Sequence, residues 1–267
     1  MSRGLIAAVV ALVIAAGAAI YWARLQIPEP AGPAARPPAP AVSEPAVAAP
    51  SPPAIQYPVE VDPQAPVDAK SAMTSLFGRE TVLSMFQLED FPRRFVATVD
   101  NLTRSQASSR IWPVTPPAGR FAVDRRDGEA VIGADNGLRY TRYVLLLEKV
   151  DVNAATATYQ RLYPQLQKAY EDLGYPGRYF NDRLVQVVDH LLATPEIPGA
   201  PKVHLPNIQG PVKAERPWVL YQFDDPALEA LSAGQKLLIR MGPVNQRRVK
   251  AKLQEFRTAL TAVKATR

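Results

Sequence analysis

NDRLVQVVDHLL, residues 181–192, has apolar side chains three and four positions apart, the spacing that places them on one face of an α-helix. Asn181 can cap the start of this helix, and Pro195 follows its end. The expected core stripe consists of Leu184, Val187, Val188, Leu191 and Leu192. Because an amphipathic helix needs other elements to cover its apolar face, the stretch favours a packed helical domain.

Segments on both sides of this stretch show similar patterns. A last helix is expected to begin near Asn245, where apolar residues are spaced 4, 3, 4 and 3 positions apart. Asn136 and Asp151 can cap two more helices, and Gly174 can end the one that Asp151 starts. Further helices are expected from Asp68 toward Gly78, over residues 80–86, over residues 91–101, after Asp225 and over residues 232–241. Five good amphipathic segments are enough for a bundle-like core.

A minor β element is expected within residues 119–132. Phe121 and Val123 alternate with polar residues there, and Asp127-Gly128 can form the turn of a short hairpin. Residues 218–223 are a candidate third strand. The sequence therefore predicts a mainly α fold, a compact helical bundle-like domain with a small β-hairpin or short sheet.

Before this domain, residues 5–22 form an unbroken apolar run, LIAAVVALVIAAGAAIYW, between Arg3 and Arg24. At 1.5 Å per residue a helix of this length reaches roughly 27 Å, close to the ~30 Å hydrocarbon core of a bilayer. Tyr21 and Trp22 stand where interfacial aromatic residues are common. The run predicts one transmembrane helix.

A cleaved signal peptide is the alternative for this segment, since Ala16-Gly17-Ala18 matches a small-x-small cleavage site. The apolar core of a signal peptide has about 7–15 residues, fewer than this run, so residues 1–24 are expected to be a retained anchor. Charges near the span are sparse, and the positive-inside rule separates the two orientations weakly. A short leader is easiest to leave in the cytoplasm, so we expect the C-terminal domain to lie outside the cytoplasm.

A proline-rich tract follows the apolar run. Proline occupies 13 of the 39 positions in residues 28–66, which favours extended backbone and leaves too few apolar residues to form a core. Pro30-Ala31-Gly32-Pro33 has PxxP spacing, but a plain spacer is the favoured interpretation. We therefore expect an anchor over residues 1–24, a disordered Pro-rich linker over residues 25–67 and a helical globular domain over residues 68–267.

The globular domain is mildly basic. It holds 28 Lys or Arg and 21 Asp or Glu, a net charge of +7, which is compatible with an anionic partner without identifying one. The chain has no cysteine and two histidines, which excludes the usual zinc cages. Because no G-x-S-x-G, G-x-G-x-x-G or phosphate-loop motif occurs either, we assign no catalytic, cofactor-binding or metal residue.

Four phrases of the domain resemble a bacterial family known as domain of unknown function 3014. They are RRFVATVDNL (93–102), WPVTPPAGRF (112–121), YEDLGYPGRYFNDRLVQVVDHLLATPE (170–196) and LSAGQKLLIRMGP (231–243). The resemblance implies a membrane-anchored envelope protein of Gram-negative type and brings no activity with it. With the expected topology, the protein would lie in the bacterial inner membrane with a periplasmic C-terminal domain.

The polar face of residues 181–192 is the first candidate site. His190 beside Asp189 or Asp182 has the composition of an acid–base pair, with Arg183 at its flank. The favoured interpretation is a solvated polar face with ion pairs three and four residues apart.

The aromatic turn YPGRYF, residues 175–180, is the second candidate. Tyr175 and Tyr179 beside Arg178 can stack on a sugar or a peptide, although such turns more often close a helix–helix junction. The basic C-terminal helix is the third candidate, for anionic lipid or wall polymer. The residues proposed as an interaction surface are Tyr175, Arg178, Tyr179, Asp182, Arg183, Asp189, His190, Arg247, Arg248 and Lys250.

Taken together, the sequence predicts a single-pass envelope protein, anchored in the membrane by residues 5–22, whose helical domain is a binding or scaffold module. The expected partner is a protein or an envelope polymer, and no nucleic acid or cofactor is expected. The alternative is a cell-envelope enzyme with its active site near His190 and Asp189.

Overall fold

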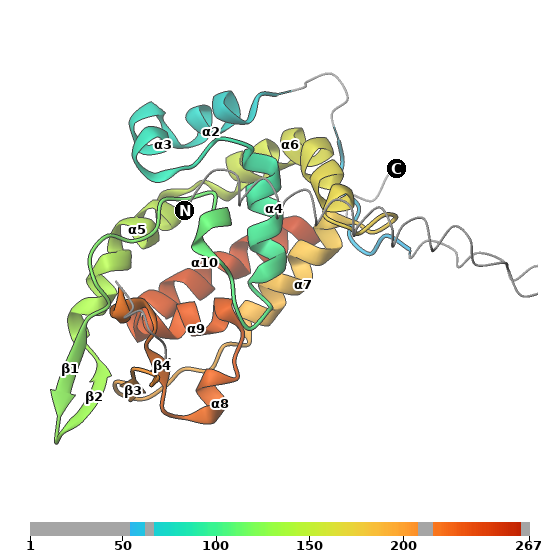
Figure 1. The fold of residues 1–267 in the computed structure, drawn as a ribbon. Helices are drawn as coiled ribbons and strands as arrows, with labels where there is room; N and C mark the ends of the chain where they lie inside the picture. The colour runs from blue at the N-terminus through green and yellow to red at the C-terminus, as the bar shows by residue number, and fades with distance from the viewer. Residues whose placement is uncertain (1–53, 62–66, 208–215, 263–267) are drawn as a thin grey trace, which may run out of the picture. The chain divides into compact units, whose positions relative to one another are not determined.

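The structure, a computed structural model, describes residues 54–61, 67–207 and 216–262 (Figure 1). All of them belong to the unit Pro50–Arg267, one of two units into which the chain divides. The predicted anchor, residues 1–24, and most of the predicted linker lie outside the described residues. Within the described ranges, no helix has the length and apolar character needed to cross a bilayer.

The described part of the chain is mainly helical, as the sequence predicts, and it has two small sheets where the sequence predicts a hairpin or one short sheet. The α-helices are α2 (Ala69–Phe77), α3 (Arg79–Met85), α4 (Phe91–Asn101), α5 (Thr141–Lys149), α6 (Val152–Asp172), α7 (Phe180–Leu192), α8 (Pro226–Glu229), α9 (Ala233–Arg240) and α10 (Pro243–Thr261). The shorter elements are the 3-10 helices η1 (Ser109–Ile111), η2 (Ala134–Tyr140) and η3 (Pro217–Val219), and the strands β1 (Val123–Arg126), β2 (Glu129–Ile132), β3 (Val203–His204) and β4 (Gln222–Phe223).

The main core lies among α4, α6, α7 and α10, which pack against one another in pairs (Figure 1). Val187, Val188 and Leu191 of the predicted stripe are buried. Val185, which the stripe leaves out, is also buried, because α7 contacts α4, α9 and α10 and is covered on more than one side. Phe180 is 0% exposed at the start of α7 and closes this core.

Several predicted helix ends are confirmed. Asp151 caps α6, with its Oδ1 accepting a hydrogen bond from the amide of Ala154 at 2.6 Å. Gly174 follows the end of α6 with φ 108°, a conformation that glycine adopts without strain. Asp225 caps α8 through the amide of Ala227 at 2.8 Å. The side chains of Asp151 and Asp225 thus bind amide groups at a helix start that have no partner within the helix.

Two predicted caps are wrong. Asn136 lies inside η2, and its buried amide donates to the carbonyl of Arg240 at 2.7 Å. Asn181 lies inside the first turn of α7, whose N-cap is Tyr179, and its amide donates to the carbonyl of Tyr57 at 2.9 Å. Both asparagines resemble caps in sequence because they stand near a helix start, but distant backbone atoms are their partners.

The two sheets are short. β1 pairs with β2 as the predicted antiparallel hairpin, with Val123 opposite Ile132. The predicted strand over residues 218–223 is largely wrong, because η3 occupies its start and only Gln222–Phe223 is extended. That remnant pairs with β3, in which His204 lies opposite Gln222. Phe223, Val203 and Ile239 form a second, smaller core beside the hairpin.

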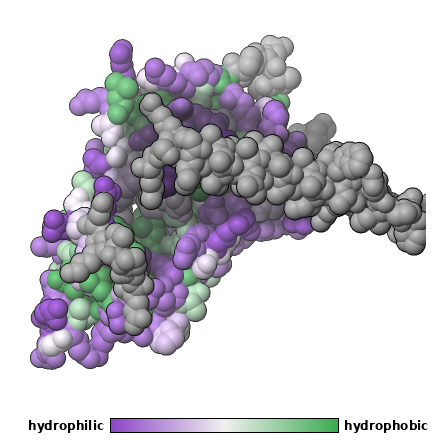
Figure 2. Space-filling view, in the orientation of Figure 1, coloured by the Kyte–Doolittle hydropathy of each residue, from purple (hydrophilic) through white to green (hydrophobic). Residues whose placement is uncertain are grey.

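The face shown in Figure 2 is mostly hydrophilic, with apolar atoms gathered in a few patches. One patch lies toward the α2–α3 end and another lies toward the strands. Isolated apolar side chains on a surface are ordinary, whereas an apolar patch next to a cavity indicates a site of contact.

Candidate binding site

The aromatic turn between α6 and α7 is held by one side chain of α6. Gln167 donates from Nε2 to the carbonyl of Arg178 at 2.7 Å and accepts at Oε1 from the amide of Phe180 at 2.8 Å. Gly177 has φ 69° and allows the chain to reverse. Gln167 therefore fixes the turn at the end that leads into α7.

A buried carboxylate, that of Asp100 on α4, gathers three side chains at one side of the turn. Arg183 of α7 donates from Nε to Asp100 Oδ1 at 3.0 Å, and Arg104 donates from Nη2 to Asp100 Oδ2 at 2.6 Å. The hydroxyl of Tyr175 donates to the same Oδ2 at 3.1 Å. The hydrogen bond to Asp100 raises the pKa of the Arg104 guanidinium. Charge-assisted bonds of this kind fix α4, α7 and the turn relative to one another.

Tyr175 also stacks on Tyr170 of α6, with ring centroids 4.6 Å apart and the ring planes 18° apart. Burial raises the pKa of the Tyr170 hydroxyl, which stays protonated at neutral pH. The stacked rings form one wall of a cavity of about 430 Å³, called the α7 pocket below. The pocket is lined by Ala54, Gln56, Asp100, Tyr170, Tyr175, Arg178, Tyr179, Asp182, Arg183 and Gln186.

Residues 54–61, called the strap below, lie against the start of α7. Both carboxylate oxygens of Asp182 accept hydrogen bonds from main-chain amides of the strap, one from Tyr57 at 2.8 Å and one from Gln56 at 3.0 Å. Asn181 donates to the Tyr57 carbonyl, so three main-chain groups of two neighbouring residues are bound by two side chains. This contact binds main chain at a bend, since Gln56 and Tyr57 form a bend in the strap, and Ala54 and Gln56 form part of the pocket wall.

The α7 pocket also contains an unpaired cation. Arg178 is exposed, and in the described ranges its guanidinium has no salt bridge. Arg183, by contrast, is committed to Asp100 and to Thr103 Oγ1. A carboxylate or carbonyl oxygen of a ligand can therefore bind Arg178 without displacing an internal partner, while the tyrosine rings offer apolar contact.

Five residues of the predicted interaction surface thus lie together in the α7 pocket: Tyr175, Arg178, Tyr179, Asp182 and Arg183. Asp189 and His190 have other partners. Asp189 forms a salt bridge with Arg257 of α10. His190 Nε2 lies 2.9 Å from the hydroxyl of Ser232, which is buried and caps α9. In the structure Asp189 is therefore paired with Arg257 and not with His190, and the contact of His190 with Ser232 links α7 to α9.

The three basic residues proposed on α10 also bind inside the domain. Arg248 pairs with Glu148 of α5, and Arg247 lies 3.5 Å from a carboxylate oxygen of Glu196. Lys250 donates to the carbonyl of Thr194 at 3.0 Å. These bonds link α10 to its neighbours and are separate from the α7 pocket. Among the described residues, no group of three His, Cys, Asp or Glu side chains is placed to hold a metal ion.

Sequence reasoning missed Asp100, Arg104 and Tyr170. The one signal for them is the spacing of Asp100 and Arg104, four residues apart at the end of a helical pattern. That spacing predicts an ordinary surface ion pair, whereas the structure buries Asp100 to 2% exposure because α6, α7 and the turn cover it.

The family comparison concerns the same region of the chain. The family model DUF3014, described as a protein of unknown function, matches residues 91–257. The chain belongs to the DUF3014 family. The family region contains Asp100, the aromatic turn and α7, whereas the strap and α2–α3 lie outside it. No curated protein and no solved structure matches the chain.

Proposed function

We propose that this DUF3014 protein is a single-pass protein of the bacterial inner membrane whose periplasmic helical domain binds a protein partner at the α7 pocket. Residues 5–22 are the proposed anchor, and residues 25–67 connect it to the domain. The apolar run, the proline-rich tract and the family resemblance support the location. The α7 pocket supports the binding role, since Arg178, which forms no salt bridge within the described ranges, lies there with tyrosine rings and with the carboxylate of Asp182, which a partner segment would take over from the strap.

The contact between Asp182 and the strap carries the proposal for the kind of partner. A carboxylate that accepts hydrogen bonds from two consecutive amides binds main chain at a bend, whatever the side chains there are. Arg178 and Tyr179 then lie beside the bound segment, where they can select its side chains. We infer that the partner presents a bent main-chain segment with two adjacent amides, and that the strap shows this mode of binding within the chain itself.

This geometry favours a protein partner over a cell-envelope enzyme. An enzyme at His190 requires a carboxylate or a second base to orient the ring, but Asp189 is bound to Arg257. The hydroxyl of Ser232 accepts a hydrogen bond from the amide of Gln235 as part of a capping box. This bond explains the position of the Ser232 hydroxyl without a catalytic role.

The location is tested by reporter fusions. Alkaline phosphatase fused after Arg267 is expected to be active, because it folds only outside the cytoplasm, and a fluorescent protein that folds only in the cytoplasm is expected to stay dark. The opposite pattern would place the domain in the cytoplasm and remove the periplasmic part of the proposal.

The mode of binding is tested by amide hydrogen exchange on the full chain. The amides of Gln56 and Tyr57 are expected to exchange about tenfold faster or more in Asp182→Ala, because a hydrogen bond to a charged acceptor contributes about 1.5–3 kcal/mol. Asp172→Ala is the matched control, since Asp172 is an exposed carboxylate that contacts Lys168 instead. Unchanged protection of the two amides in Asp182→Ala would show that Asp182 does not hold the strap.

A further inference from the structure

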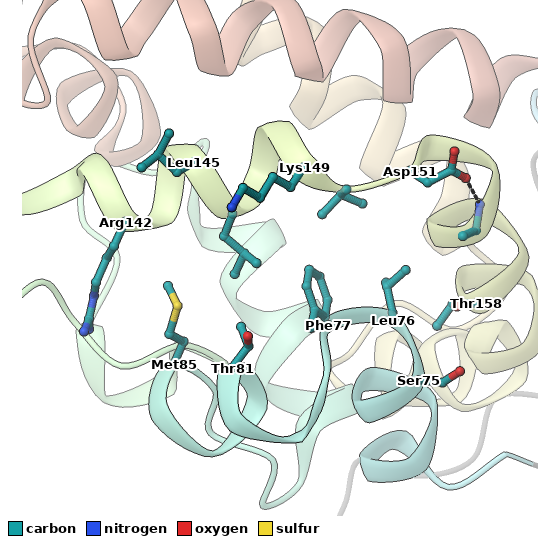
Figure 3. A pocket seen from close by; sticks show the side chains of 13 residues that line it. Ser75, Leu76, Phe77, Thr81, Met85, Arg142, Leu145, Lys149, Asp151 and Thr158 are labelled. Atoms are coloured by element: carbon teal, nitrogen blue, oxygen red, sulfur yellow. Dashed lines mark hydrogen bonds between the residues drawn. The ribbon is translucent and has the colours of Figure 1, made fainter.

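A second cavity lies between the α2–α3 pair and the segment that joins α5 to α6, away from the α7 pocket (Figure 3). Its volume is about 600 Å³, within the range of about 300–1,000 Å³ that is usual for pockets holding a single small molecule. The cavity is called the α5 groove below, and its apolar lining is Leu76, Phe77, Met85, Leu145, Leu146 and Val150. Leu145 is 42% exposed, which leaves apolar surface available to a ligand.

Two cations stand on the α5 wall of this groove. Arg142 and Lys149 are seven residues apart, two helical turns, and therefore lie on the same side of α5 about 10.5 Å apart along its axis. Arg142 donates to the hydroxyl of Tyr143. In the part of the chain that the structure describes, neither cation forms a salt bridge, whereas Glu148 of the same helix pairs with Arg248. The groove thus combines apolar walls with two cations that form no salt bridge within the described residues.

The charges also give the groove a direction. Figure 3 shows Arg142 at one end, Asp151 at the other, and Phe77 and Leu76 between them. The carboxylate of Asp151 accepts the amide of Ala154 and repels a second anion at its end of the groove. An anionic group is therefore favoured at the Arg142 end, and an apolar chain can extend from there along Phe77 and Leu76.

We propose that the α5 groove binds a long-chain fatty acid, with its carboxylate at Arg142, its acyl chain along Phe77, Leu76 and Val150, and Lys149 adding positive charge to the same wall. The charge complementarity requires an anionic head, and the guanidinium of Arg142 matches the geometry of a carboxylate. The volume suits one acyl chain rather than the two chains of a phospholipid. This site is independent of the α7 pocket, because the two cavities share no lining residue.

The proposal is tested with the full chain in phospholipid nanodiscs and a palmitic acid analogue that carries a diazirine on its acyl chain. After illumination, mass spectrometry is expected to find the label in peptides from α2–α3 and from residues 141–158. The double variant Arg142→Glu and Lys149→Glu is expected to reduce this labelling about tenfold, because the charge-assisted contact at Arg142 is lost and the α5 wall becomes negative. The double variant Arg125→Glu and Arg126→Glu makes the same change of charge on β1 and is expected to keep the labelling.

The head group and the number of chains are tested with two further probes. The fatty alcohol with the same diazirine is expected to label the groove weakly, and a diacyl phosphatidylglycerol analogue is expected not to label it. Equal labelling by acid and alcohol would overturn the role of Arg142 and Lys149. Stronger labelling by the diacyl lipid, or acid labelling confined to residues 5–22, would overturn the proposed ligand.

Discussion

Asp100→Ala is expected to lower the free energy of unfolding by about 3–5 kcal/mol, because it removes a carboxylate with 2% exposure and leaves the half-buried Arg183 without its partner. The same change releases Tyr175, whose hydroxyl donates to Asp100. Urea unfolding of a fragment that starts at residue 54, followed by circular dichroism, measures the loss.

The control for this change is Asp172→Ala, which removes an exposed partner of Lys168 and is expected to cost at most about 1 kcal/mol. Equal losses in the two variants would mean that Asp100 stabilises the domain no more than a surface ion pair does, and the structural basis of the α7 pocket would then be wrong.

Phe180→Ala is expected to cost about 3–5 kcal/mol, since Phe180 is fully buried and a cavity would remain in the core. Its ring contacts those of Phe95 and Tyr170, with centroids 6.1 Å and 5.7 Å away, so the loss includes aromatic contacts as well as buried area.

Tyr179→Ala, one residue earlier, is the matched control for Phe180→Ala. Tyr179 lines the α7 pocket and is only partly buried, so its replacement is expected to cost clearly less than that of Phe180. A larger loss for Tyr179 than for Phe180 would mean that the turn points its side chains the other way, with Tyr179 in the core.

Local patterns in the sequence were enough to predict most of the helices. Asp151, Gly174 and Asp225 mark helix ends because each residue type acts within one turn of its own position. The hairpin around Asp127-Gly128 was predictable for the same reason. The errors at Asn136 and Asn181 arise where distant backbone atoms compete for a side chain, and these partners leave no periodic trace in the sequence.

The candidate site was predictable only in part. The aromatic turn and the start of α7 stand together in the sequence, so grouping Tyr175, Arg178 and Asp182 required no knowledge of the fold. Asp100 is 83 residues from Arg183 in the sequence, and Tyr57 of the strap is 125 residues from Asp182. Neither contact follows from the spacing of residues in the sequence. The partners of Arg248 and Asp189 likewise depend on how α10 packs against α5 and α7.

Photo-crosslinking from the α7 pocket in living cells tests the central claim, that this pocket binds a protein partner. A benzophenone-bearing residue in place of Gln186, an exposed residue that lines the pocket, is expected to give a discrete adduct with another protein in the full chain, and the same residue in place of Arg125 on β1 is expected to give none. Asp182→Ala is expected to reduce the adduct, because main-chain amides of the partner need the Asp182 carboxylate that accepts from the strap in this structure. Identical adducts from both positions, or none from position 186, would contradict the claim.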